Sequence, residues 1–115
     1  MHELSIAMSM VEMAAEEAAR RGGAHVCAIH LRLGPLSGVV REALLFSYDV
    51  ACEGTSLAGS RLVIEDVPVV VFCPDCAKEQ TLDSIQRFFC PVCGAPTSQV
   101  LSGTELEVFA LELEQ

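Results

Sequence analysis

Four of the six cysteines form two short pairs that could together hold a metal ion. Cys73 and Cys76 form one C-x-x-C pair, Cys90 and Cys93 form the second, and residues 77–89 separate them. Each C-x-x-C turn brings two thiolates to one side of the chain, and two facing turns supply the four sulfur ligands that zinc accepts in structural sites. The spacing therefore predicts one structural zinc ion, with no ligand position left open for catalysis.

Other interpretations of these cysteines stay open at this point. Buried thiols or a redox pair are alternatives, and an iron site of the rubredoxin type uses the same four ligands and would be red. Gly94 can adopt the positive φ that points backbone N–H groups at sulfur, whereas Ala77 holds the equivalent place after the first pair. Cys27 and Cys52 have no such partner, so we expect them to be small core residues.

The first residues of the chain could bind a different metal. The amine of Met1 and the amide nitrogen and imidazole of His2 can form fused chelate rings in one plane, and planar nitrogen ligands favour Ni(II) or Cu(II) over Zn(II). Both groups must release protons to bind, so binding should weaken as the pH falls. Taken alone, a histidine near the chain start is most often a solvated residue that has no function.

Composition narrows the classes of function. The 115 residues suit one compact domain or a small domain with a metal-stapled insert. Sixteen acidic residues stand against seven basic ones, for a net charge of -9, which argues against nucleic acid as a partner. No basic leader opens the sequence, and no apolar run is long enough to cross a membrane. We therefore expect a cytoplasmic protein whose paired thiols bind metal and do not form disulfides.

Hydrophobic periodicity predicts an α+β fold. The expected helices span residues 4–21, with Leu4, Met8, Val11, Ala15 and Ala18 facing inward, and residues 39–52, capped by Ser37, with Val40, Leu44 and Ala51 facing inward. Strands are expected at residues 25–33, 61–65, 67–72 and 105–114, the last with a change of apolar parity near Val108. The simplest arrangement is a small mixed β-sheet covered by two helices, with an inserted zinc-ribbon-like lobe. The expected division is a domain of residues 1–70 and 99–115 and a zinc-binding domain of residues 71–98.

Several longer motifs resemble a known family. They are the opening MHELSIA, then HLRLGPLSGV, EGTSLAGSRLVIEDVP, the two C-P-x-C turns, and the closing SGTELEV. Together they cover nearly the whole chain, which resembles the hydrogenase-maturation nickel chaperones of the HypA/HybF type.

The resemblance implies a metal carrier. Met1, His2 and Glu3 would hold transported Ni(II), and the four paired cysteines would hold structural zinc. Nickel would pass to the large subunit of [NiFe]-hydrogenase with the help of a HypB-type GTPase. The chain itself has no G-x-x-x-x-G-K-[ST] loop and a single lysine, Lys78, so it is not expected to hydrolyse GTP. No Ser-His-Asp or Cys-His nucleophile emerges from the sequence, so no enzymatic activity is expected.

Two further classes of function remain as rivals. A zinc-ribbon adaptor that recruits a protein without transporting metal would account for the cysteines and the acidity, and an enzyme would show turnover without partners. The resemblance does not decide between a monomer and a homodimer, and it assigns no role to Cys27 or Cys52.

Overall fold

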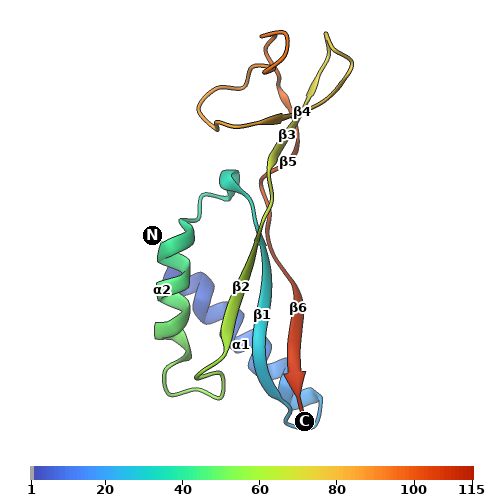
Figure 1. The fold of residues 1–115 in the computed structure, drawn as a ribbon. Coiled ribbons are helices and arrows are strands. Elements are labelled where there is room, and N and C mark those ends of the chain that lie inside the picture. The colour runs from blue at the N-terminus through green and yellow to red at the C-terminus, as the bar shows by residue number, and fades with distance from the viewer. Residues whose placement is uncertain (1) are drawn as a thin grey trace. The chain divides into compact units, whose positions relative to one another are not determined.

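The computed structural model describes residues 2–115, which form two helices and six strands (Figure 1). The elements follow one another as α1 (Glu3–Arg20), β1 (His25–Leu33), a short 3-10 helix (Pro35–Ser37), α2 (Arg41–Cys52), β2 (Arg61–Asp66), β3 (Val69–Cys73), β4 (Lys78–Leu82), β5 (Gln99–Ser102) and β6 (Leu106–Glu114). The chain divides into two compact units. The first holds residues up to Leu31, Val39–Glu65 and Glu107–Gln115, and the second holds Arg32–Gly38 and Asp66–Leu106.

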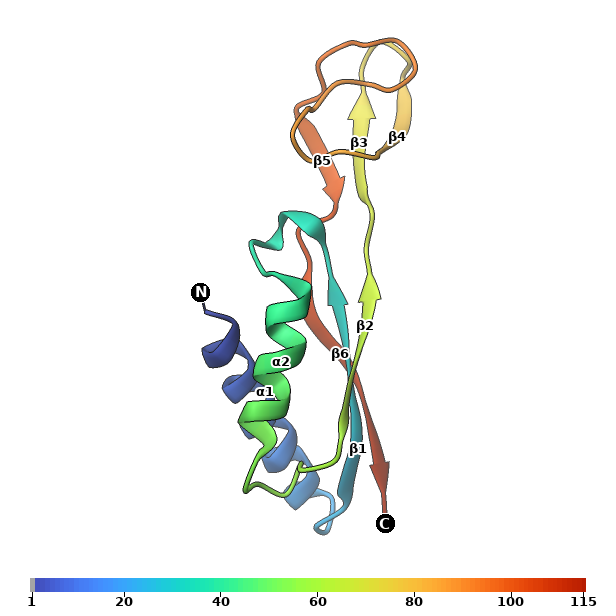
Figure 2. The same cartoon turned by 60° about the vertical axis from the view of Figure 1, so that its left-hand side comes forward.

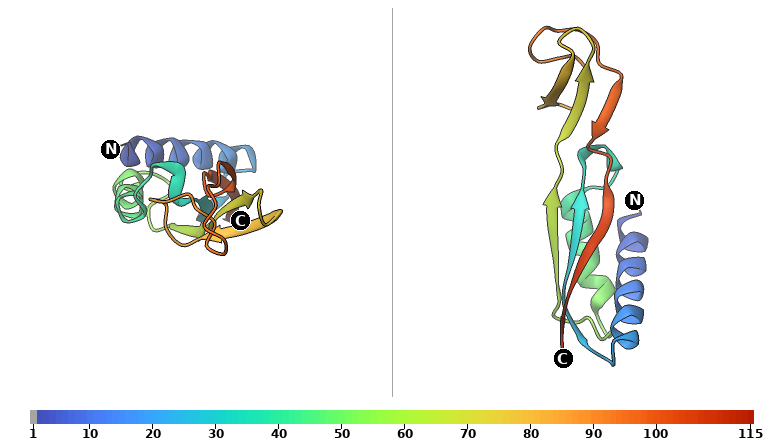
Figure 3. Two further views of the ribbon diagram at one scale, coloured as in Figure 1. Left: turned by 90° about the horizontal axis from the view of Figure 1, so that it is seen from above. Right: turned by 90° about the vertical axis from the view of Figure 1, so that its right-hand side faces the viewer.

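The first unit is a three-stranded mixed sheet with both helices on one face. The strand order is β2-β1-β6, and the arrows show β1 and β2 running in the same direction with β6 opposed (Figure 3). α1 and α2 pack against each other on the same side of these strands (Figure 2). The expected α+β class, with a mixed sheet covered by two helices, is confirmed.

The buried face of α1 matches the expected one only in part. Val11 and Ala18 are buried as expected, whereas Leu4 and Met8 are 45% and 56% exposed. The other buried positions are Glu3, Ala7, Met10 and Ala14. Apolar residues occur around much of this helix, so hydrophobic periodicity was compatible with more than one buried face. The alanines let another element approach the helix closely, and this packing selects the buried stripe.

The second helix also begins and faces differently from expectation. Val40 is its N-cap residue and is exposed, whereas Ser37 belongs to the preceding 3-10 helix. Leu44 is buried as expected, and Ala51 is half-buried. The buried side chains are Leu44, Tyr48 and Cys52, which recur every four residues. The Tyr48 hydroxyl lies 2.6 Å from the Ser60 hydroxyl, and burial is the main cause that raises the Tyr48 pKa to about 12.

The second unit contains a separate antiparallel sheet of order β4-β3-β5. This differs from the single sheet that the strand pattern suggested. Pro68 immediately precedes β3, so its missing N–H does not interrupt this central strand. Val69, Val71 and Leu82 form its small buried cluster, against which Leu36 and Phe88 pack.

Two glycines allow the chain segments of the second unit to approach closely. The Gly34 N–H donates to the Glu105 carbonyl at 2.8 Å, and the Leu36 N–H donates to the Gly103 carbonyl at 2.8 Å. A Cβ on Gly34 would lie 2.1 Å from the Gly103 oxygen, and Gly103 has a φ of 114°. Any larger residue at Gly34 would push these segments apart.

This second unit extends beyond the expected zinc-binding segment 71–98, because it also contains residues 32–38 and strand β5. The functional division of the chain at residues 70 and 99 stays a prediction. Among the described residues, no helix is both long and apolar enough to cross a bilayer.

Candidate functional site

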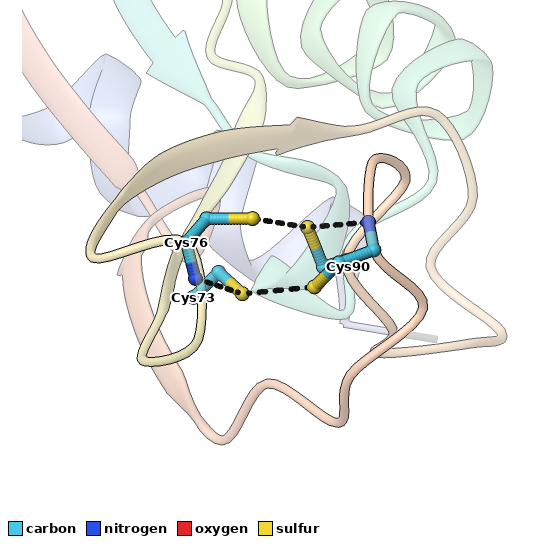
Figure 4. Close-up of side chains that lie close together, drawn as sticks. Cys73, Cys76 and Cys90 are labelled. Atoms are coloured by element: carbon cyan, nitrogen blue, oxygen red, sulfur yellow. Dashed lines mark hydrogen bonds between the residues drawn. The ribbon is translucent and has the colours of Figure 1, made fainter.

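The thiols of both C-x-x-C pairs converge on one point in the second unit. Cys73 ends strand β3, Cys76 lies in the turn before β4, and Cys90 and Cys93 lie in a second turn that an isolated bridge between Phe89 and Pro96 closes. Figure 4 shows Cys73, Cys76 and Cys90 with their sulfur atoms directed toward one another. The four sulfur atoms lie within 4.8 Å of one another, so the structure brings together all four cysteines of the expected metal site.

The distances between sulfur atoms match a tetrahedral metal site. Cys73 Sγ lies 3.5 Å from Cys93 Sγ, and Cys76 Sγ lies 3.8 Å from Cys90 Sγ. Four sulfur atoms at about 2.3 Å from a central ion would be separated by about 3.8 Å, whereas a disulfide bond is about 2.0 Å long. All six cysteines are free, and the geometry is compatible with zinc.

Backbone N–H groups surround two of the sulfur atoms. Cys76 N–H points to Cys73 Sγ at 3.4 Å, and the N–H groups of Val92 and Cys93 point to Cys90 Sγ at 3.4 and 3.5 Å. These donors favour the thiolate form that a metal requires. The two turns are thus similar in local hydrogen bonding as well as in sequence.

Both turns end in a left-handed backbone conformation. Gly94 has a φ of 77° and Ala77 a φ of 57°, the only positive φ at a non-glycine position among the described residues. The Gly94 N–H also donates to the Cys90 carbonyl at 2.9 Å. The expectation that these two positions are equivalent is confirmed, and alanine is the strained one of the two.

Without a bound cation, the thiols of the cluster differ in pKa. Burial raises the pKa of Cys90, but the N–H groups of Cys93 and Val92 outweigh that effect and lower its pKa to about 6. The Cys93 thiol and burial raise the pKa of Cys76 to about 12. Since neighbouring thiolates repel one another, a divalent cation at their centre is what allows all four to be ionised together.

At the other candidate site, His2 directly precedes helix α1 and its side chain is exposed. Its carbonyl accepts the Ile6 N–H at 2.9 Å and the Ser5 hydroxyl at 3.0 Å. Met1, the other proposed nitrogen donor, lies outside the described residues. The imidazole is therefore accessible at the start of a helix.

Glu3 has a structural contact that sequence reasoning missed. Its side chain is buried, and its Oε2 accepts the Val40 N–H at 2.9 Å. This hydrogen bond, together with one from its own backbone N–H, lowers the Glu3 pKa to about 2. The ionised carboxylate thus joins the first turn of α1 to the N-cap residue of α2. No local signal could have shown this contact, because the two residues are 37 positions apart.

Known proteins similar to this chain share one family name. A family model described as "Hydrogenase/urease nickel incorporation, metallochaperone, hypA" matches residues 1–113. The hydrogenase maturation factor HypA of Chloroflexus aurantiacus is 54% identical over 112 residues, which cover 97% of this chain and 98% of that protein. The factor of the same name from Roseiflexus sp. is 54% identical over 114 residues, or 99% and 93% of the two chains.

Solved structures show the same fold. The solution structure of the Ni metallochaperone HypA from Helicobacter pylori matches with a TM-score of 0.62 and 22% identity over 99% of this chain and 98% of that one. The family match and the relatives that align over nearly the full length settle the classification. The chain belongs to the HypA family of hydrogenase and urease nickel-incorporation metallochaperones.

Proposed function

We propose that this protein binds Ni(II) through Met1, His2 and Glu3 and delivers it for the maturation of [NiFe]-hydrogenase. The observation that carries the proposal is the family match, which runs from the first residue to residue 113 and names nickel incorporation. A HypB-type GTPase and the hydrogenase large subunit are the proposed partners, and the cytoplasm is the proposed location. The protein acts as a carrier and not as an enzyme.

The start of helix α1 supports a nitrogen-ligand site. The first N–H groups of a helix have no carbonyl partner within the helix, so the amide nitrogens near His2 are not committed to helical hydrogen bonds. The positive end of the helix dipole opposes a bound cation, and the negative charge of Glu3 in the first turn offsets it. These opposing effects suit a moderate affinity, as a carrier that must release its ion requires.

The role of Glu3 is the part of this proposal that the structure sharpens. One of its carboxylate oxygens accepts the Val40 N–H, so the proposed nickel contribution of Glu3 comes from its backbone nitrogen, its negative charge and its remaining carboxylate oxygen. The same carboxylate fixes the direction in which α1 starts, and thereby the position of the amide groups next to His2.

Zinc bound by Cys73, Cys76, Cys90 and Cys93 is proposed to be structural. Its ligand set leaves no open position, and the unit that holds it buries only a small apolar cluster. The proposed ion therefore stabilises this unit and takes no part in transport. Purified protein that is red would indicate iron at this site instead.

A zinc-bound adaptor without metal transport is the alternative, and a nickel titration separates the two. We expect protein with a native N-terminus to bind one Ni(II) with the pale absorption of planar nickel. A form with an added N-terminal extension and the variant His2→Ala should lose this binding while keeping zinc. His25→Ala, which removes another exposed imidazole, is the matched control and should bind nickel normally.

Equal nickel binding by the native and extended forms would reject the proposed ligands. Delivery is tested separately by adding a competing chelator and then purified hydrogenase large subunit that lacks nickel. A complex that never yields its ion to either acceptor would reject the carrier role, even if Met1 and His2 proved to be ligands.

A further inference from the structure

Strand β6 leaves one edge of the helix-covered sheet unpaired. It is the last strand in the order β2-β1-β6, and α1 runs alongside it (Figure 3). Between the two elements lies a groove of about 380 Å³. Its lining consists of Met13, Glu17, Arg21, Val108, Phe109, Ala110, Leu111 and Leu113. A strand edge beside an open groove is the usual arrangement for binding an added strand.

The exposure of β6 shows which side chains face the groove. Val108, Leu111 and Leu113 are half-buried, whereas Phe109 and Ala110 are both exposed. Two consecutive exposed residues at this pair interrupt the alternation, in line with the change of parity near Val108 that the sequence suggested. Beyond it, Leu111 and Leu113 face the helix side, while Glu112 and Glu114 are exposed on the opposite side. The edge therefore offers one apolar row and one acidic row.

The compact unit that contains this edge is strongly acidic. The first unit contains eleven of the sixteen acidic residues of the chain and four of its seven basic ones, so it carries -7 of the net charge of -9. Its cations are already engaged. Glu17 binds Arg20 at 3.1 Å and Arg21 at 2.9 Å, and Glu112 lies 3.6 Å from Arg61. The net negative charge of this unit therefore favours a positively charged partner.

The same charges argue against a second copy of the chain as the occupant. β6 itself holds Glu107, Glu112 and Glu114 and no basic residue. Antiparallel pairing of two such strands would place carboxylates opposite one another, which is destabilising. Acidic edges are also one of the ways in which proteins prevent their sheets from pairing with themselves.

We propose that β6 and the adjacent groove bind an extended segment of another protein in which basic and branched apolar residues alternate. The incoming strand pairs with the outer backbone edge of β6, and its apolar side chains enter the groove. Its basic side chains meet Glu114 and compete with His30 and Arg61 for Glu112. This alternation follows from the period of two along both strands. The inference goes beyond nickel delivery and does not depend on it, since it uses neither His2 nor the cysteines.

The test uses fluorescently labelled peptides of about six residues, the usual length of a strand, with full-length zinc-bound protein. A peptide of alternating lysine and valine should bind, as measured by fluorescence anisotropy. A peptide of alternating glutamate and valine should not bind, and neither should a lysine block followed by a valine block. Raising the salt from about 0.01 M to about 0.15 M should weaken binding, since the Debye length falls from about 30 Å to about 8 Å.

Three changes then locate the binding site. The double variant Glu112→Gln, Glu114→Gln should weaken binding of the alternating basic peptide by about two- to fivefold per charge, and Leu113→Ser should weaken it further. Phe46→Ser, which alters an apolar side chain that is 72% exposed on α2, is the matched control and should have no effect. Circular dichroism and zinc content verify that each variant is folded.

Methylation of alternate peptide nitrogens tests the backbone pairing without changing the protein, and it should abolish binding. The proposal is wrong if the block peptide binds as well as the alternating one, or if methylation has no effect. It is also wrong if Phe46→Ser weakens binding as much as Leu113→Ser, or if the protein alone dimerises through β6.

Discussion

The two compact units are stabilised in different ways. In the first unit, large side chains from several elements are fully buried, among them Ile29, Leu44, Tyr48 and Leu57. In the second, the buried cluster is limited to Val69, Val71 and Leu82, and four thiols converge nearby. The first unit therefore depends on apolar packing, whereas the second depends on a bound ion. Loss of metal and loss of a core side chain should consequently affect different parts of the chain.

Removal of the proposed zinc should have the largest effect. Structural zinc sites contribute on the order of 10 kcal/mol of apparent binding free energy to the folded state, far more than the small cluster of the second unit can replace. We expect Cys73→Ser, or strong chelation, to abolish zinc binding and to collapse the amide NMR signals of β3, β4 and β5 into the narrow range of an unfolded chain. Signals from α1 and α2 should persist.

Cys27→Ser is the control for this experiment, since Cys27 lies on β1 and outside the cysteine cluster. It should retain one zinc per chain by elemental analysis. If chelation unfolded both units together, the proposed difference in their stabilisation would be wrong.

A core substitution in α2 should produce the reverse pattern. Leu44 is fully buried, so Leu44→Ala should lower the free energy of unfolding by about 2–5 kcal/mol. Urea denaturation followed by circular dichroism at helical wavelengths measures this loss, and zinc content at low urea should be unchanged. Phe46→Ala, an exposed neighbour, should change stability by less than about 0.5 kcal/mol. Equal losses for the two variants would contradict the assigned buried face.

The contrast between the units also explains what the sequence could and could not predict. The convergence of the cysteines and the positive φ at Ala77 and Gly94 follow from spacing and residue type within a few positions, which local chemistry determines. The buried stripe of α1 was predicted correctly at Val11 and Ala18 but incorrectly at Leu4 and Met8. Apolar residues occur on several sides of this helix, and only the elements that pack against it select the stripe.

Contacts between distant residues gave no usable pattern. Glu3 meets Val40 across 37 positions, and His30 lies 2.5 Å from Glu112 across 82 positions. The separation into two sheets was likewise missed, because strand periodicity indicates which residues are buried but not which strands pair. The family resemblance supplied the proposed role of His2, which its residue type alone could not.

Removal of the hydrogen bond between Glu3 and Val40 should lower stability less than the Leu44→Ala substitution does. Glu3→Ala leaves the Val40 N–H without its acceptor at the start of α2, so the urea midpoint should fall. Glu3→Gln retains a carbonyl oxygen and should have a smaller effect. Glu16→Gln, on the exposed side of the same helix, is the control.

Nickel titration of these Glu3 variants distinguishes its two roles. If the carboxylate acts only by positioning α1, nickel binding should weaken in Glu3→Ala and be largely restored in Glu3→Gln. If both variants lose nickel equally while Glu3→Gln remains stable, the negative charge is required at the site itself.

The smallest effect is expected from substitutions at the residue that follows each of the two cysteine turns. Ala77 and Gly94 occupy equivalent places, with φ of 57° and 77°. An L-residue costs about 1–2 kcal/mol in this conformation. Replacing it by glycine removes that cost, but it raises the entropy of the unfolded chain and so destabilises the folded state by about 0.4–1 kcal/mol. Ala77→Gly should therefore stabilise the second unit by about 1 kcal/mol or less, seen as slower zinc loss to a chelator. Gly94→Ala should accelerate that loss. If Ala77→Gly accelerated zinc loss instead, the Ala77 methyl group would have to contribute packing that exceeds its backbone strain.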